Sequence, residues 1–511
     1  MSTARYSGAI YGSTGLTYGA RAINRQLTWI LLIDWDNDGV FNGDNEAARI
    51  FDLETTNGRQ FYMKSDGSGP EEVSEGSVSL SLDNHDGRFD PYNLSSPLAG
   101  YIMPGRKFQL KVVDEATGTI YPIMTGAIEE IRPNYGAIDT VKMTLINEKR
   151  QLSKTIVRTT VQQNMRYDDA LDKILDTIGW SASKRDIDSN ISEVMPYWWG
   201  GGNDAWTEMQ GVADAALGML CISEDGKLTY ISRISGDSST VTLGDSDVTL
   251  DYGIRTPSPW ETVRNRIWIY ARAWHQSTDV ELWNSNDQLM ILPGESKALW
   301  ATYTAGGESA VATSVTQPVA NTDYMFNSAP DGTGTDLTSY ISIVMSAFAT
   351  TAKLTITNSG ATTAYRKLLK LRGNAITPDK YTYVERTDQA SIDDYGDLLY
   401  EIKSDWLQDV NTAIDEANIL IARLVTARQY PRVKISDKPS KQFALKLFRL
   451  VNTNFVCKGI SGEFRVGYIK HRWLDRTGDR VETEIFLEPN LMSNLSGTWI
   501  FPATMGVTTV F

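Results

Sequence analysis

Apolar residues recur at every second position in many short stretches of this chain. Val78, Leu80 and Leu82 share one face within EGSVSLSLDN, and the stretches that begin at Arg106 and Ala137 repeat the pattern. A strict period of two indicates a β-strand with one buried face. Gly, Asn, Asp and Ser separate these stretches, and such spacing indicates barrels or sandwiches.

Three segments have a helical period instead. The first two are MRYDDALDKILDTIGW (165–180) and NDAWTEMQGVADAALGM (203–219), and the longest is predicted from about Asp393 to Arg428. Gly179 is placed to end the first helix in a left-handed conformation. Asp225-Gly226, between two apolar runs, predicts a β-hairpin.

Composition changes at three places along the chain. Residues 276–380 are rich in Thr, Ser, Ala and Gly with few charges, which indicates a separate, inserted β-sandwich. Residues 1–25 carry Tyr6, Tyr11 and Tyr18, each followed closely by Gly. Such a segment buries little by itself, so it is interpreted either as a flexible leader or as an arm that docks on a neighbouring subunit. Residues 490–511 are interpreted as a similar arm.

Charge and composition narrow the possible functions. The 511 residues have a net charge of −14 and 41% hydrophobic content, which is typical of a multidomain globular protein. An acidic chain repels the phosphate backbone, so bulk nucleic-acid binding is disfavoured. Two cysteines and three histidines leave little material for a disulfide framework or a histidine-rich metal centre. No apolar run is long enough to span a membrane, and no signal peptide is evident.

The strongest local candidate for a ligand site is DWDNDGVFNGDNE. Asp34, Asp36 and Asp38 alternate before Gly39, which is the pattern that a structural Ca²⁺ ion requires. An EF-hand would place Glu at the twelfth position, where this chain has Asn45 instead, and the preceding TWILLI is a predicted strand. The alternative is an acidic turn whose aspartates cap backbone amides.

Two further clusters have structural interpretations that we favour. His85 lies among acidic residues in LDNHDGRFDPYN, where turn chemistry explains the pattern and Arg88 is expected to pair with a nearby carboxylate of that stretch. Trp198 and Trp199 precede a glycine run. They are either a carbohydrate-stacking or partner-contact loop, or a loop packed under the neighbouring helix. We find no recognisable catalytic motif, so no catalytic residue is assigned.

Several motifs in collinear order resemble the tail-tip, or baseplate hub, proteins of long-tailed bacteriophages. They are LLIDWDNDGVF, EGSVSLSLDNHDGRFDPYNLSSPLAGYIMPGRKFQLKV, YPIMTGAIEEIRP, PWETVRNRIWIYA, LPGESKALWATYT, DQASIDDYG, QYPRVKI and GYIKHRWLDRTGDRVETEIFLEP, and they span about residues 26–489.

The resemblance implies a mainly β, multidomain chain with some α structure. The expected parts are an N-terminal arm, two tube-forming β-barrels, a helix-containing α+β domain, the inserted β-sandwich and a C-terminal arm. The N-terminal arm is 1–25, and the two barrels are 26–155 and 256–275 plus 432–489. The α+β domain is 156–255 plus 385–430. The sandwich is 276–380, and the C-terminal arm is 490–511. Three copies with two barrels each would match a sixfold tube.

The resemblance also implies partner proteins and a location in the virion. The protein would be a non-enzymatic virion protein, made in the host cytoplasm, acting as a homotrimer at the tail tip. It would contact the distal tail protein, the tail tube and tape measure proteins, and tail fibre or receptor-binding proteins, which carry host attachment. DNA would pass during ejection without specific binding. The alternative is a polysaccharide-binding or polysaccharide-degrading tail protein.

Overall fold

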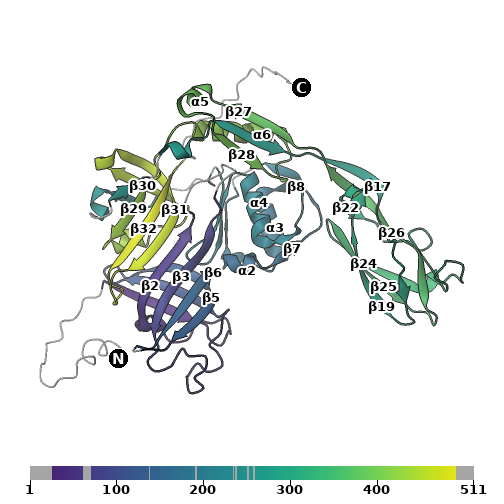
Figure 1. Cartoon of the computed structure of the whole chain (residues 1–511), viewed down its shortest axis with the longest axis horizontal. Coiled ribbons are helices and arrows are strands. Elements are labelled where there is room, and N and C mark those ends of the chain that lie inside the picture. The colour runs from purple at the N-terminus through teal and green to yellow at the C-terminus, as the bar shows by residue number, and fades with distance from the viewer. Residues whose placement is uncertain are drawn as a thin grey trace.

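The computed structural model describes residues 26–490 except 61–70, 137, 190–192, 234, 236–238, 250–252 and 257–258. It is mainly β and multidomain, as predicted, with an elongated arm that projects from the remaining domains (Figure 1). The alternating stretches at 74–83, 107–114 and 140–147 all form strands.

Six strands surround one apolar core in the first β domain. Their order is β1-β4-β5-β6-β3-β2, and every strand contributes residues to that core. The strands are β1 (Leu27–Ile33), β2 (Ile50–Gly58), β3 (Ser74–Asp83), β4 (Lys107–Asp114), β5 (Thr119–Asn134) and β6 (Thr140–Asn147), and the short helix η1 (Glu46–Arg49) follows β1. Among the strand pairs of the described residues, β1 and β2 do not pair with each other.

The second β domain also has six strands, in the order β14-β30-β31-β32-β29-β15. They are β14 (Val241–Gly244), β15 (Ile254–Arg255), β29 (Arg432–Ser436), β30 (Leu450–Phe455), β31 (Ile460–Trp473) and β32 (Val481–Pro489), with the short helix α7 (Pro439–Gln442) beside them. The prediction that residues 256–275 belong to this domain is wrong for the strand they contain, because β16 (Arg266–Ala271) pairs in another sheet.

The helical domain confirms two of the predicted helices. The helices α3 (Tyr167–Thr177) and α4 (Ala205–Ala215) share an apolar core with the hairpin of β12 (Met219–Ile222) and β13 (Leu228–Ile231). Gly179 and Gly226 have positive φ, as their turns require. The other elements are α2 (Lys149–Leu152), β7 (Ile156–Arg158), β8 (Gln162–Arg166), η2 (Ala182–Lys184), β9 (Arg185–Ile187), β10 (Val194–Trp198), β11 (Gly201–Asp204) and η3 (Asp245–Asp247).

The predicted long helix over 393–428 is wrong. It is divided into α5 (Gln389–Tyr395), β28 (Leu399–Lys403) and α6 (Val410–Leu424). Gly396 ends α5 at φ +82, and the Asp409 side chain caps the new helix at the Thr412 amide. The strand β28 pairs with β16, which pairs in turn with β27 (Thr382–Thr387), and α6 packs on this small sheet.

The projecting arm is a β-sandwich formed within 274–378, close to the predicted 276–380. Two sheets enclose one apolar core (Figure 1). One sheet contains β17 (Trp274–Asn284), β18 (Met290–Ile291), β22 (Val311–Val315), β23 (Tyr324–Asn327) and β26 (Ala364–Pro378), and the other contains β19 (Ser296–Thr302), β24 (Ile341–Ala347) and β25 (Thr351–Asn358). The small elements of the arm are β20 (Thr304–Ala305), β21 (Glu308–Ser309) and η5 (Thr338–Tyr340). Outside the arm, η4 (Pro259–Thr262) precedes β16 and η6 (Val456–Lys458) follows β30.

Candidate functional site

The two β domains are joined edge to edge by one strand pair. The first half of β31 pairs with β30 over Ile460–Arg465, and its second half pairs with β2 of the first domain over Tyr468–Arg472. The β2 residues involved run from Glu54 to Gly58. One twelve-stranded sheet therefore continues through both domains and fixes their relative position (Figure 1).

Two glycines allow the strands to approach closely at this joint. A Cβ on Gly58 would lie 2.2 Å from the carbonyl oxygen of Gly467, and Gly58 has φ +109. The amide of Arg59 donates to the same carbonyl at 2.8 Å. Only glycine accommodates both the positive φ and the close contact, so the passage of β2 along β31 requires it.

A buried ion pair lies next to these glycines. Arg59 donates from Nε and Nη2 to the two carboxylate oxygens of Glu488, each at 2.7 Å. The side chains are only 6% and 3% exposed, and the guanidinium lies 5.1 Å from the centre of the Phe448 ring. This bidentate geometry links the end of β2 to β32 across the domain boundary.

On the buried face of the joint, His471 is held as a neutral imidazole. Its Nδ1 lies 2.9 Å from Oγ1 of Thr483, and its ring packs 5.2 Å from the Phe443 ring. Burial lowers the pKa of His471 to about 4, because a charged imidazole loses its hydration there. The His471 side chain is therefore uncharged at pH 7.

Charged side chains of both signs line the opposite face of the sheet. Nζ of Lys470 lies 2.8 Å from Glu54 across the joint, and Nζ of Lys434 lies 2.8 Å from Glu482. Acidic and basic residues alternate along neighbouring strands, so the face is polar but close to charge balance. In these two pairs each lysine faces a carboxylate on a neighbouring strand.

The structure brings Asp34, Asp36 and Asp38 together. One oxygen from each lies within 4.8 Å of the others. Asp34 is buried, and its two oxygens accept hydrogen bonds from the amides of Asp38 and Gly39 at 3.1 and 3.0 Å. This is the amide-capping turn of the alternative interpretation, and it holds three carboxylates within reach of one cation. The Ca²⁺ site stays a prediction.

The neighbouring residues that could complete such a site have other partners. The Asn45 side chain bridges the edge of β1, because it accepts from the Leu31 amide and donates to the Trp29 carbonyl. Glu46 pairs with Arg88 at 2.7 Å. The expected pairing of Arg88 within its own stretch is therefore wrong, since its side chain reaches Glu46 and Asp44 on the other loop, at 2.7 and 3.0 Å.

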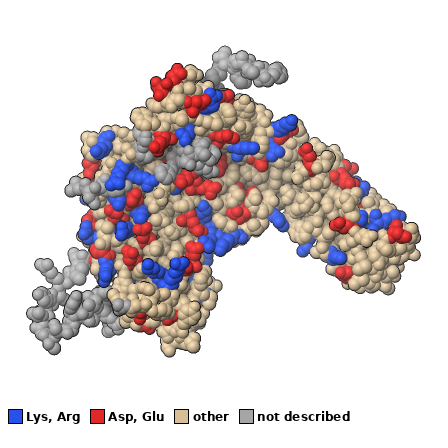
Figure 2. All heavy atoms as spheres, in the orientation of Figure 1, with Lys and Arg blue, Asp and Glu red and all other residues tan. Residues whose placement is uncertain are grey.

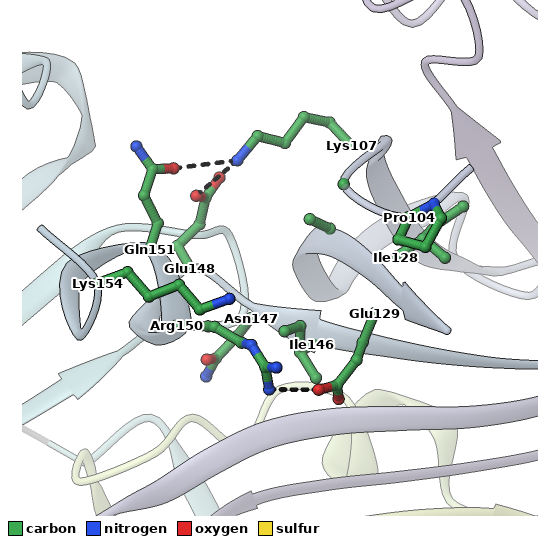
Figure 3. Close-up of a pocket in the computed structure, with 12 residues that line it drawn as sticks. Pro104, Lys107, Ile128, Glu129, Ile146, Asn147, Glu148, Arg150, Gln151 and Lys154 are labelled. Atoms are coloured by element: carbon green, nitrogen blue, oxygen red, sulfur yellow. Dashed lines mark hydrogen bonds and ion pairs between the residues drawn. The ribbon is translucent and has the colours of Figure 1, made fainter. Parts of the chain in front are cut away.

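A pocket of about 290 Å³ lies where the first β domain meets α2 (Figure 3). Four of its charged side chains pair with one another: Lys107 donates to Glu148 at 3.0 Å, and Arg150 pairs with Glu129. Glu148 is buried and also pairs with Lys184 at 3.1 Å. Through Glu148, these ion pairs connect the first β domain to the helical domain. Lys154 also lines the pocket.

The tryptophans Trp198 and Trp199 are buried, so the carbohydrate-stacking interpretation of this loop is wrong. Trp199 packs edge-to-face on Trp274 and Trp406, with ring centres 5.0 Å apart in both pairs. Trp274 begins the arm, and Trp406 precedes α6. The aromatic cluster therefore anchors the base of the arm to the helical domain.

Two buried ion pairs could not be predicted from the sequence. The Arg59–Glu488 pair joins residues 429 positions apart. Glu416 of α6 is fully buried 3.6 Å from Arg233 of the helical domain, and burial raises its pKa to about 8. No local sequence pattern indicates either pair. Within the part of the chain that the structure describes, we find no nucleophile, base and acid arranged for catalysis.

The fold defines a class of protein: a multidomain β protein with two six-stranded β domains joined edge to edge, a helical domain and a projecting sandwich. No family model matches the chain, and no curated protein matches it either. Among the described residues, no helix is long and apolar enough to cross a membrane.

Among solved structures, the chain is similar to several tail proteins. One is the 43 kDa tail protein of prophage MuSo2 from Shewanella oneidensis, with a TM-score of 0.49 and 11% identity, covering 91% of this chain and 99% of that one. A second is the tail protein from Neisseria meningitidis MC58, with a TM-score of 0.49, 9% identity and coverage of 91% and 98%. A third is prophage tail protein gp18 from Listeria monocytogenes EGD-e, with a TM-score of 0.42, 8% identity and coverage of 90% and 94%.

Proposed function

We propose that this protein is a structural virion protein, the homotrimeric hub of a phage tail tip. The observation that carries the proposal is the edge-to-edge joint, which places two six-stranded β domains side by side in one sheet. The collinear sequence motifs over residues 26–489 support the same assignment. Three copies would then present six comparable β domains to a sixfold tube.

The joint supports this role because it makes the pair of domains rigid. Two separately tethered domains would sample many relative orientations. A shared sheet, a bidentate buried ion pair and a glycine contact allow one orientation. A ring that must match a fixed tube diameter benefits from subunits whose two domains cannot rotate independently.

The polar face of the sheet suits the wall of a DNA channel. Several of its basic side chains are paired with carboxylates, as in Lys470–Glu54 and Lys434–Glu482. Paired cations offer little free positive charge to phosphates, so DNA would pass without sticking. In this proposal the partners are the distal tail protein, the tail tube and tape measure proteins, and the fibre or receptor-binding proteins.

Mass measurement and imaging test the proposal. A trimer of the 56.9 kDa chain has a mass of about 170 kDa, measured by light scattering after size-exclusion chromatography. Averaged images of the particle along its axis should show six densities around a channel. A strict monomer at high concentration contradicts the proposal, and glycan binding by such a monomer would favour the polysaccharide-binding alternative.

A further inference from the structure

The loops at one end of the first β domain form one surface, which we call the loop surface and define as residues 34–46 and 83–105. Ion pairs hold the two loops together. Arg88 joins Asp44 and Glu46, and Arg49 pairs with Asp86 at 2.7 Å. These loops lie at the lower end of the molecule in Figure 1, and Figure 2 shows the molecule in the same orientation.

Large apolar side chains project from the loop surface into solvent. Tyr92 is 84% exposed and Leu94 is 89% exposed, and the same surface presents Val40, Tyr101 and Met103. The exposed Tyr135 of the adjacent β5–β6 hairpin extends it, because its hydroxyl donates to Asp90 at 2.8 Å. Several exposed apolar side chains on neighbouring loops are typical of an interaction site.

Backbone hydrogen bonds fix the shape of this surface. The amides of Gly87, Asp90, Asn93 and Ser96 each donate to the carbonyl three residues earlier, at 2.8 to 3.3 Å. Side chains reinforce the turns, as where Asp90 accepts from the Tyr92 amide at 2.9 Å. A surface already held in place gives up little conformational entropy when a partner binds.

The charge of the surface restricts its partner. Residues 34–46 and 83–105 contain eight acidic residues and one arginine, a net charge of −7 within a chain of −14. Arg49 neutralises Asp86 from outside the two loops, whereas Asp36 and Asp38 are exposed. The complementary partner carries aromatic or aliphatic side chains between basic ones.

One segment of this chain has that composition. Residues 1–25 contain Arg5, Arg21 and Arg25, three tyrosines and no acidic residue. The segment joins β1 at the end that pairs with Asp114, whereas the loop surface lies at the opposite end of β1, which pairs with Phe108. Twenty-five residues extend over up to about 80 Å, which is ample to reach another subunit.

We propose that residues 1–25 of one copy dock on the loop surface of a neighbouring copy, with arginines against the aspartates and tyrosines against Tyr92 and Leu94. This inference rests on the proposed function, since it needs a homo-oligomer. It identifies a surface through which adjacent subunits hold each other. Residues 1–25 would join the subunits without using a sheet edge.

Photo-crosslinking in the full-length assembly tests the inference. Benzoylphenylalanine at position 94 is irradiated in particles assembled from a mixture of isotope-labelled and unlabelled chains, and the crosslinked peptides are identified by mass spectrometry. Crosslinks from position 94 to residues 1–25 that join a labelled to an unlabelled chain are expected. The same probe at Val319, which is 49% exposed on the arm, serves as the matched control and should not capture residues 1–25.

The outcomes separate the two proposals. A trimer whose position 94 captures only its own segment, another region or nothing overturns the inference and leaves the hub proposal standing. A monomer overturns the hub proposal itself. Capture only after a second virion protein is added would assign the surface to that protein and also overturn the inference.

Peptide binding gives an independent measurement. A synthetic peptide of residues 1–25 should bind the protein lacking those residues, and added salt should weaken the binding. Tyr92→Ser combined with Leu94→Ser should weaken it at least about tenfold, and both positions are too exposed for these changes to disturb the core. Equal binding to the double variant contradicts the inference.

Discussion

Removing the charge of Glu488 should loosen the joint between the two β domains. The Glu488→Gln substitution keeps the side-chain shape but leaves the Arg59 guanidinium without its counter-charge, where the pair is 6% and 3% exposed. Breaking a buried ion pair from one side costs about 3–5 kcal/mol. Because each 1.4 kcal/mol is about a factor of ten, local opening of the joint should become more than about a hundredfold more frequent.

Hydrogen exchange of individual backbone amides measures this opening. The amides that pair β2 with β31, over Glu54–Gly58 and Tyr468–Arg472, should exchange faster in Glu488→Gln, whereas those in the arm sandwich should not change. The double variant Arg59→Met/Glu488→Leu, which removes both charges, should recover most of the protection. Lys470→Gln, which removes a partly exposed pair with Glu54, is the matched control and should cost less than about 1 kcal/mol.

Two results would refute this reasoning. Unchanged exchange in β2 and β31 of Glu488→Gln would show that the ion pair does not hold the joint. Equal or greater loss of protection in the double variant would show that lost packing, rather than an unpaired charge, causes the opening.

Three further predictions concern pH and metal. Because the pKa of His471 is lowered to about 4 in the folded protein, the unfolded chain takes up this proton at a higher pH, near 6.5. Folding stability should therefore fall by about 3 kcal/mol as the pH drops from 6.5 to 4. His471→Gln should flatten the pH dependence of β31 amide exchange. The raised pKa of Glu416 has the opposite sign, because the unfolded carboxyl ionises near pH 4.5 and the folded one near pH 8. Contact between α6 and the helical domain should weaken as pH rises through that range, and Glu416→Gln should abolish the trend in amide exchange of α6. If the three carboxylates of the Asp34 loop hold Ca²⁺, calcium should raise the melting temperature and EDTA should lower it, with Asp36→Asn insensitive to both; identical melting curves in calcium and EDTA would contradict the site.

Local pattern was sufficient for most strands and for the two compact helices. Alternation in the EGSVSLSLDN stretch predicts β3 because each strand needs only one buried face, and that requirement is written in consecutive residues. The helices α3 and α4 follow from their apolar stripes and end signals in the same way. The sandwich was found from composition, since a Thr-rich and Ser-rich segment without helical period has few other stable forms.

Predictions failed where a distant contact decided the outcome. The helical period over 393–428 is continuous enough to suggest one helix, but Leu399–Lys403 pairs with β16 and becomes a strand. The segment Arg266–Ala271 alternates like a barrel strand, and alternation alone does not name its neighbours. The Arg88 side chain pairs with carboxylates on another loop and not with the acidic residues beside it in the sequence.

The sequence by itself therefore determined most strands, the two helices α3 and α4, where the sandwich lies, and that the chain is acidic with a basic first segment. These properties depend on neighbouring residues and on totals. Only the tertiary structure decided that two six-stranded domains share one sheet, that Arg59 meets Glu488, and that Trp198 and Trp199 are buried. Those outcomes depend on contacts between residues far apart in the chain, and no local pattern specifies which distant strand or charge will be the partner.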